Sequence, residues 1–170
     1  MKKWIAPICS AVVGILSFIM LCFNWIAYKA SYGGVKVVDE KVTGWDLIKD
    51  SDKIYKELDG YTLYKVAAII MLVVAVVAII AAVVLLLNNL NVIKLNLDLN
   101  LINNIVLSVL VFTVVLAFVG LFMMRADMLD TWKDMGLKST SANAHVGAWL
   151  QLVISVVACG LSWAFGRKAK

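Results

Sequence analysis

The sequence predicts an all-α membrane protein: a bundle of four transmembrane helices with a small outer cap. Two observations lead to this fold class. Hydrophobic residues make up 63% of the 170 residues, and the mean hydropathy is +0.92, whereas soluble domains are about 45–50% apolar. Four apolar runs, at 5–27, 66–87, 105–124 and 146–165, contain no Asp, Glu, Lys, Arg or His. Each run is long enough to cross a hydrocarbon core about 30 Å thick as a helix.

These runs divide residues 1–170, treated as a single domain, into spans and loops. The predicted loops are an outer loop at 28–65, an inner loop at 88–104 and an outer loop at 125–145. We expect the first run to be a retained span, because its apolar stretch exceeds the 7–15 residues usual for a secretory signal.

The distribution of charge bears on how the chain is threaded. The termini and the inner loop carry the whole excess of +5, which places both termini in the cytoplasm. A count of basic residues alone favours the opposite orientation. We expect a multi-pass protein of the plasma membrane with both termini cytoplasmic, because a tail of two lysines before a long span is hard to translocate.

The first outer loop is expected to form the cap, from a short β-hairpin and an amphipathic helix. Residues 34–38 and 41–43 are β-branched segments around Asp39 and Glu40, which is typical of a hairpin. Residues 43–46, Thr-Gly-Trp-Asp, match a capping box. This motif predicts a helix over 45–58, with Gly60 as its stop.

One face of this predicted helix is apolar. Two interpretations remain open: the face covers the bundle or the lipid headgroups, or it binds a partner protein. The candidate partner-binding residues are Trp45, Leu47, Ile48, Ile54, Tyr55 and Leu58.

The other two loops give weaker signals. Residues 95–101 alternate Leu with Asn or Asp, which fits a half-buried strand, an irregular interfacial segment, extensions of the adjacent helices or a strand that pairs with a partner. In the third loop we expect a short helix over 128–135, followed by a flexible segment at 136–143.

Small and polar residues recur at helical spacing inside the spans, where membrane helices usually contact each other. We expect the bundle to pack through these faces, with alanines 68, 75, 78 and 82 as a smooth stripe on the second span. The candidate packing residues on the first and fourth spans are Ser10, Gly14, Ser17, Gly147, Gln151, Ser155 and Cys159.

The predicted layout resembles that of the claudin-type tetraspan superfamily. Both have four spans, internal termini, a long first outer loop with strand character and a shorter second outer loop. Trp25 with Gly44-Trp45 is similar to the Trp and Gly-Leu-Trp signature of that family. A short GWDL element at 44–47 is also similar to stretches in small uncharacterised bacterial four-span proteins. The resemblance to the claudin type implies adhesion, barrier or accessory-subunit roles and no catalytic residue.

The chain lacks the groups that several membrane functions require. It has no Cys-x-x-Cys pair, no His-Glu-x-x-His motif and a single histidine. Its runs carry no carboxylate that would bind a coupling ion. We therefore expect a non-catalytic membrane protein, with no cofactor, no metal site and no nucleic-acid partner. Its expected partners are the lipid bilayer and another membrane or extracellular protein, or a second copy of itself. The alternative is a homo-oligomeric pore lined by Ser, Gln and Thr side chains.

Overall fold

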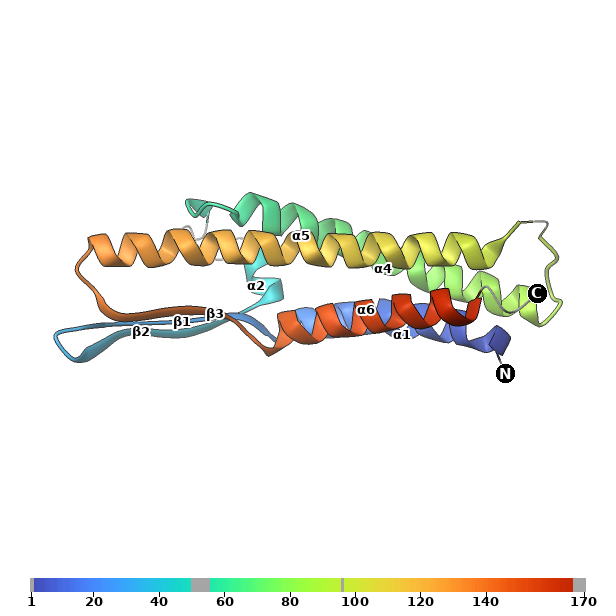
Figure 1. Cartoon of the computed structure of the whole chain (residues 1–170), viewed down its shortest axis with the longest axis horizontal. Helices are drawn as coiled ribbons and strands as arrows, with labels where there is room; N and C mark the ends of the chain where they lie inside the picture. The colour runs from blue at the N-terminus through green and yellow to red at the C-terminus, as the bar shows by residue number, and fades with distance from the viewer. Residues whose placement is uncertain (1, 50–55, 96, 167–170) are drawn as a thin grey trace. The chain divides into compact units, whose positions relative to one another are not determined.

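The computed structural model describes residues 2–49, 56–95 and 97–166, which are mostly helical with one small sheet (Figure 1). The chain forms two compact units. Unit 1 comprises Met1–Ile19, Ile70–Val114 and Gln151–Lys170, and unit 2 comprises Met20–Ile69 and Val115–Leu150.

Four apolar helices supply residues to both units. They are α1 (Ile5–Leu21), α4 (Tyr61–Asn89), α5 (Leu99–Asp134) and α6 (Val146–Gly166), and a short 3-10 turn, η1 (Lys2–Trp4), precedes them. The apolar runs at 66–87, 105–124 and 146–165 each lie inside one of these helices.

The first apolar run is not a single helix, so the expected helical span over 5–27 is wrong. α1 ends at Leu21, and strand β1 (Asn24–Tyr32) begins three residues later. The buried Trp25 turns its indole N–H back onto the carbonyl oxygen of Met20, 2.8 Å away, at the end of the helix. A fully buried strand and a buried helix both appear as continuous apolar runs, which is why this boundary was not apparent from the sequence.

β1 is the central strand of a three-stranded antiparallel sheet in unit 2, in the order β2-β1-β3. β2 (Val35–Thr43) pairs with β1 across a two-residue turn, Gly33-Gly34. Both glycines have positive φ, 57° and 85°, as a type I′ hairpin turn requires. The hairpin predicted around Asp39 and Glu40 is therefore misplaced, because β2 passes through both residues without a break.

The third strand, β3 (Lys138–Ala144), corrects the expectation of a flexible segment at 136–143. Its sequence has no apolar alternation, and it is ordered by pairing with β1. The predicted helix at 128–135 is helical, but it is the end of α5 rather than a separate element. α5 stops in a Schellman arrangement: Gly136, with φ 74°, donates to the Lys133 carbonyl, and Leu137 donates to the Trp132 carbonyl.

In the second loop, the adjacent helices extend toward each other. α4 continues to Asn89, and α5 starts at Leu99 with the Asp98 carboxylate accepting from the Leu101 amide at 3.1 Å. The described residues between them form turns and bends. The described residues of this loop therefore agree with extended helices joined by an irregular connection, and none of them forms a strand.

Candidate functional site

The core of unit 2 is built around Trp25. Its ring lies edge-on to Tyr64, with centroids 5.8 Å apart, and both side chains are fully buried. A Cβ atom added at Gly44 would come within 2.9 Å of the Trp25 Nε1 atom, and one at Gly147 within 2.9 Å of its Cδ1 atom. The two glycines thus leave the space that the indole fills.

The helix after β2 begins as the capping box predicts. The Asp46 amide donates to the Thr43 Oγ1 atom at 3.1 Å, and that hydroxyl donates to the Asp46 carboxylate at 2.6 Å. Helix α2 is described over Gly44–Lys49, and residues 50–55 of the predicted 45–58 helix lie outside the described part of the chain. The Tyr61 hydroxyl donates to the Leu47 carbonyl, and the Tyr64 hydroxyl donates to the Gly44 carbonyl, so α4 holds α2 in place.

Only part of the predicted partner-binding face is exposed. Leu47 is fully buried, so its side chain belongs to the core and is not carried forward as a contact residue. Trp45, Ile48 and Leu58 are half-buried, whereas positions 54 and 55, the predicted Ile and Tyr contacts, are outside the described residues.

A pocket of about 770 Å³ opens in unit 2, and Leu58 is part of its wall. We call it the acidic pocket, because three carboxylates lie in its lining. The lining residues are Tyr28, Val38, Glu40, Glu57, Leu58, Asp127, Met128, Thr131, Trp132 and Met135. They come from β1, β2, the turn before α4 and the end of α5, so the pocket depends on the folded unit.

Two hydrogen bonds and one ring contact fix the walls of the acidic pocket. The Tyr28 hydroxyl donates to the Glu40 carboxylate at 3.0 Å, and the Asp59 amide donates to the Asp127 carboxylate at 2.9 Å. The rings of Tyr28 and Trp132 are 5.9 Å apart at an angle of 60°. Tyr28 is nearly buried, and Trp132 is half-buried.

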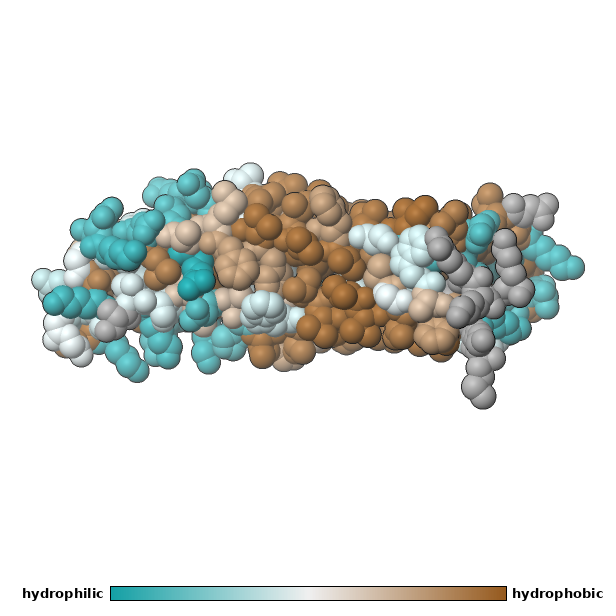
Figure 2. Space-filling view, in the orientation of Figure 1, coloured by the Kyte–Doolittle hydropathy of each residue, from teal (hydrophilic) through white to brown (hydrophobic). Residues whose placement is uncertain are grey.

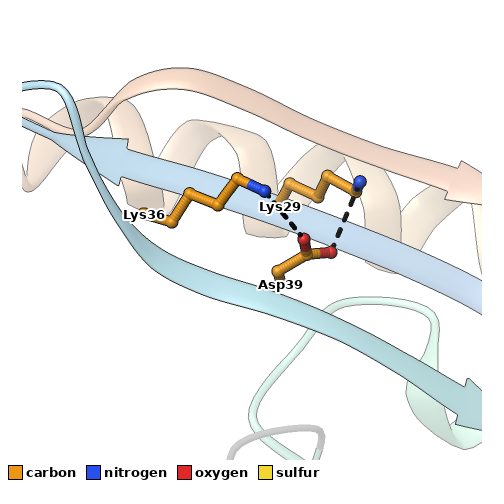
Figure 3. Close-up of polar contacts among 3 residues, drawn as sticks. All are labelled: Lys29, Lys36 and Asp39. Atoms are coloured by element: carbon orange, nitrogen blue, oxygen red, sulfur yellow. Dashed lines mark ion pairs between the residues drawn. The ribbon is translucent and has the colours of Figure 1, made fainter.

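The opposite face of the sheet carries a different set of charges (Figure 3). Asp39 pairs with Lys29 at 3.4 Å and with Lys36 at 3.5 Å. Partial loss of hydration raises the pKa of the Asp39 carboxyl, but the charges and hydrogen bonds of Lys29 and Lys36 outweigh this effect and leave it below its ordinary value. Because neighbouring strand residues point to opposite faces, Lys29 and Asp39 lie on the side away from Glu40. A register shift in the pairing between Ala30 and Ser31 brings Lys36 to Asp39 on that same side.

Unit 1 contains a second polar cluster, buried among its helices. The Ser10 hydroxyl donates to the Asn103 side-chain carbonyl at 2.6 Å, the Asn103 amide donates to Ser162 at 3.1 Å, and Ser162 donates to Asn104 at 2.6 Å. All four side chains are at most 1% exposed. We call them the amide–hydroxyl network, which connects α1, α5 and α6.

The predicted packing residues take part in helix contacts. The Gln151 amide donates to Ser17 at 2.8 Å and to Ser155 at 3.1 Å, and the Cys159 sulfur lies 3.6 Å from the Ser108 hydroxyl. The alanines of the predicted stripe are buried. Gly147 differs from the other predicted packing residues, because its close neighbours are Trp25 and the backbone of Asn24 in unit 2 rather than another helix.

Of the amide–hydroxyl network the sequence predicts only Ser10, and it indicates neither the other three members nor the acidic pocket. Asn103 and Asn104 fall in the predicted inner loop, because the apolar run begins only at residue 105. A helix start at Asp98 followed by Leu99 was the available signal. The pocket combines residues from four separate segments, and no local motif in the sequence indicates that they meet.

The helices expose large apolar side chains and bury small or polar ones. Exposed on α4 are Val66, Ile69, Ile70, Val73, Val76, Val77, Ile80 and Val83, whereas its buried residues include Ala67, Ala68, Ala75, Ala78 and Ala82. The visible surface is hydrophobic over a broad area (Figure 2). This pattern is the reverse of that in soluble proteins and is typical of helices surrounded by lipid.

Among the described residues, three helices are long and apolar enough to cross a membrane: α4, α5 and α6. This defines the class of the chain as a multi-pass integral membrane protein. α1 is apolar but has 17 residues, fewer than the about 20 that a span usually needs. Comparisons with protein families, with curated proteins and with solved structures found no match.

Proposed function

We propose that this chain is a non-catalytic membrane protein that recognises another membrane or extracellular protein through unit 2. In this proposal α1 is a fourth, short span, both termini are cytoplasmic, and unit 2 displays its sheet and acidic pocket outside the plasma membrane. The function would be that of an accessory or interaction subunit.

The acidic pocket is the observation that carries this proposal. Its volume of about 770 Å³ lies in the range of about 300–1,000 Å³ in which proteins hold ligands. Its walls offer an aromatic ring at Trp132, two thioethers and three carboxylates, and aromatic anchors in such pockets often supply most of the binding energy of an interface.

The pore alternative has less support. A homo-oligomeric pore needs polar side chains on a surface that several copies share. Ser10, Ser17, Thr113, Gln151 and Ser155 are instead at most 3% exposed in a single chain. Their hydroxyl groups and the Gln151 amide N–H bond to partners within unit 1, which favours a packing role, although the Gln151 Oε1 atom is buried without a partner among the described residues.

The test is purification of the tagged full chain in a mild detergent from the cells that produce it. We expect a stoichiometric partner to accompany the wild-type protein. Trp132→Ala, which removes an aromatic wall of the pocket, is expected to weaken that complex about ten-fold or more.

The matched control is Trp149→Ala. Trp149 also belongs to unit 2 and is 49% exposed, but it contacts Phe118 rather than the pocket. The Trp149 variant should keep the partner. Recovery of the wild-type chain only as copies of itself would contradict the proposal and favour the pore.

A further inference from the structure

The charges on the described lining of the acidic pocket all have the same sign. Glu40, Glu57 and Asp127 are among its lining residues, and none of the described residues that line it is Lys, Arg or His. The lysines of the neighbouring sheet face, Lys29 and Lys36, are held by Asp39 on the other side of the sheet (Figure 3). The described lining of the pocket therefore carries negative charge only.

The carboxylates retain capacity to accept hydrogen bonds. Glu40 accepts from Tyr28 through Oε2, and Asp127 accepts from the Asp59 amide through Oδ2. An ionised carboxylate can accept about four hydrogen bonds. Each of these groups can thus receive a further donor without giving up its present one, and the present bonds hold it in position.

The remaining walls suit an organic cation rather than a metal ion. Trp132 and Tyr28 present aromatic rings, and a guanidinium or ammonium group over such a ring is stabilised by cation–π attraction. Thr131 and Trp132 also lie in the last turn of α5, where the helix dipole favours positive charge. The described residues contain no group of three or more His, Cys, Asp or Glu side chains close enough to hold a metal.

We propose that the acidic pocket binds the guanidinium group of an arginine in a basic segment of the partner protein. Arginine fits better than lysine, because its planar fork makes paired hydrogen bonds to carboxylates and stacks on aromatic faces. This inference rests on the proposed function, since it names the chemistry that the partner presents.

The experiment measures binding of a fluorescent five-residue peptide, Gly-Arg-Gly-Arg-Gly, to the full chain in a non-ionic detergent at fixed ionic strength. The comparison peptide carries citrulline in place of both arginines, which keeps the shape and removes the charge. We expect the arginine peptide to bind about ten-fold or more tightly than the citrulline peptide. Equal affinities for the two peptides would overturn the inference.

Isosteric variants locate the site. Glu40→Gln, Glu57→Gln and Asp127→Asn each remove a charge, while the new amide oxygen still accepts the bonds from Tyr28 and from the Asp59 backbone. We expect each to weaken binding of the arginine peptide several-fold, and the triple variant to bring it to the level of the citrulline peptide. Thermal unfolding followed by circular dichroism verifies that the variants fold.

Two controls lie next to the tested residues but outside the pocket. Asp39→Asn lies beside Glu40 on β2 and faces the two lysines, and Asp130→Asn lies one turn along α5 from Asp127 and pairs with Lys133. Both should bind the arginine peptide as the wild type does. Equal losses in the pocket variants and these controls would show a diffuse charge effect and overturn the inference.

Failure of this inference and failure of the proposed function are distinguishable. If the triple variant still co-purifies with the partner and the two peptides bind equally, the partner-binding function stands and the arginine site is wrong. If the wild-type chain purifies without a partner yet prefers the arginine peptide, the site stands and the proposed function is wrong.

Discussion

Gly14 lets the backbones of α1 and α4 approach each other closely in unit 1. A Cβ atom at this position would lie 2.6 Å from the Ile79 side chain and 2.9 Å from the Ala75 carbonyl oxygen. The carbonyl belongs to the helix backbone and cannot rotate away, so a side chain at residue 14 has to push the two helices apart. Gly160 on α6 has no such neighbour within 4 Å.

These two glycines form a matched pair for a stability test. Gly14→Ala is expected to lower the free energy of unfolding by about 1–3 kcal/mol, the usual range for overpacking. Gly160→Ala should be neutral or stabilise by up to about 1 kcal/mol, because alanine favours a helix more than glycine does. Unfolding in mixtures of mild and denaturing detergent measures both. A smaller loss for Gly14→Ala than for Gly160→Ala would contradict this packing.

Among single residues, the sequence predicted those whose role depends on neighbours within a few turns of the same helix. The Thr43 cap and the contact role of Gly14 follow from short-range patterns, because capping and small-residue spacing act within a few turns of one helix. It did not predict that Leu47 is buried, since an amphipathic pattern shows which residues share a face but not what covers that face.

The end of α5 nearest Leu99 is held to α1 and α6 by the amide–hydroxyl network. Asn103 accepts from Ser10 and donates to Ser162, so it contacts both neighbouring helices. In an apolar environment an unpaired amide is costly, which makes these bonds specific for one helix arrangement. Asn103 thus fixes the register of three elements.

Asn103→Ala is expected to lower the free energy of unfolding by about 1–2 kcal/mol, because it breaks two buried hydrogen bonds and removes the acceptor of the buried Ser10 hydroxyl. The same detergent titration measures the change. Asn100→Ala is the control: it lies one turn earlier on α5 and is half-buried, and its effect should stay within about 0.5 kcal/mol. Equal effects at the two positions would show that the network contributes nothing specific.

The elements that the sequence did not predict correctly are those whose state depends on a distant partner. The sequence predicts helix at the start of β1, because Trp25 and Ile26 continue an apolar run. The strand forms instead because β1 pairs on both sides. β3 has no large apolar side chain, and it forms against the free edge of β1. The turn at Gly33-Gly34 was the one local signal that would have placed the hairpin correctly.

For the whole molecule, the outward-facing side chains indicate whether lipid or water surrounds the helices. Val73 and Ile80 on α4 and Phe112 on α5 are each more than half exposed, and in water such a surface would associate or aggregate. Composition predicted the membrane environment and three of the helices, because both depend on long apolar runs alone. The acidic pocket is formed by residues from separate segments that meet only in the folded chain, so it cannot be predicted from composition.

The central claim is that lipid surrounds the apolar helices and that the sheet and the acidic pocket of unit 2 face water on one side of the membrane. The most direct measurement is labelling of single cysteines, placed in a chain without its native ones, by a membrane-impermeant maleimide in intact cells. We predict that Lys36→Cys in the hairpin is labelled at once, and that Lys3→Cys and Lys94→Cys are labelled only after permeabilisation. Labelling of positions 36 and 94 from the same side would contradict the account.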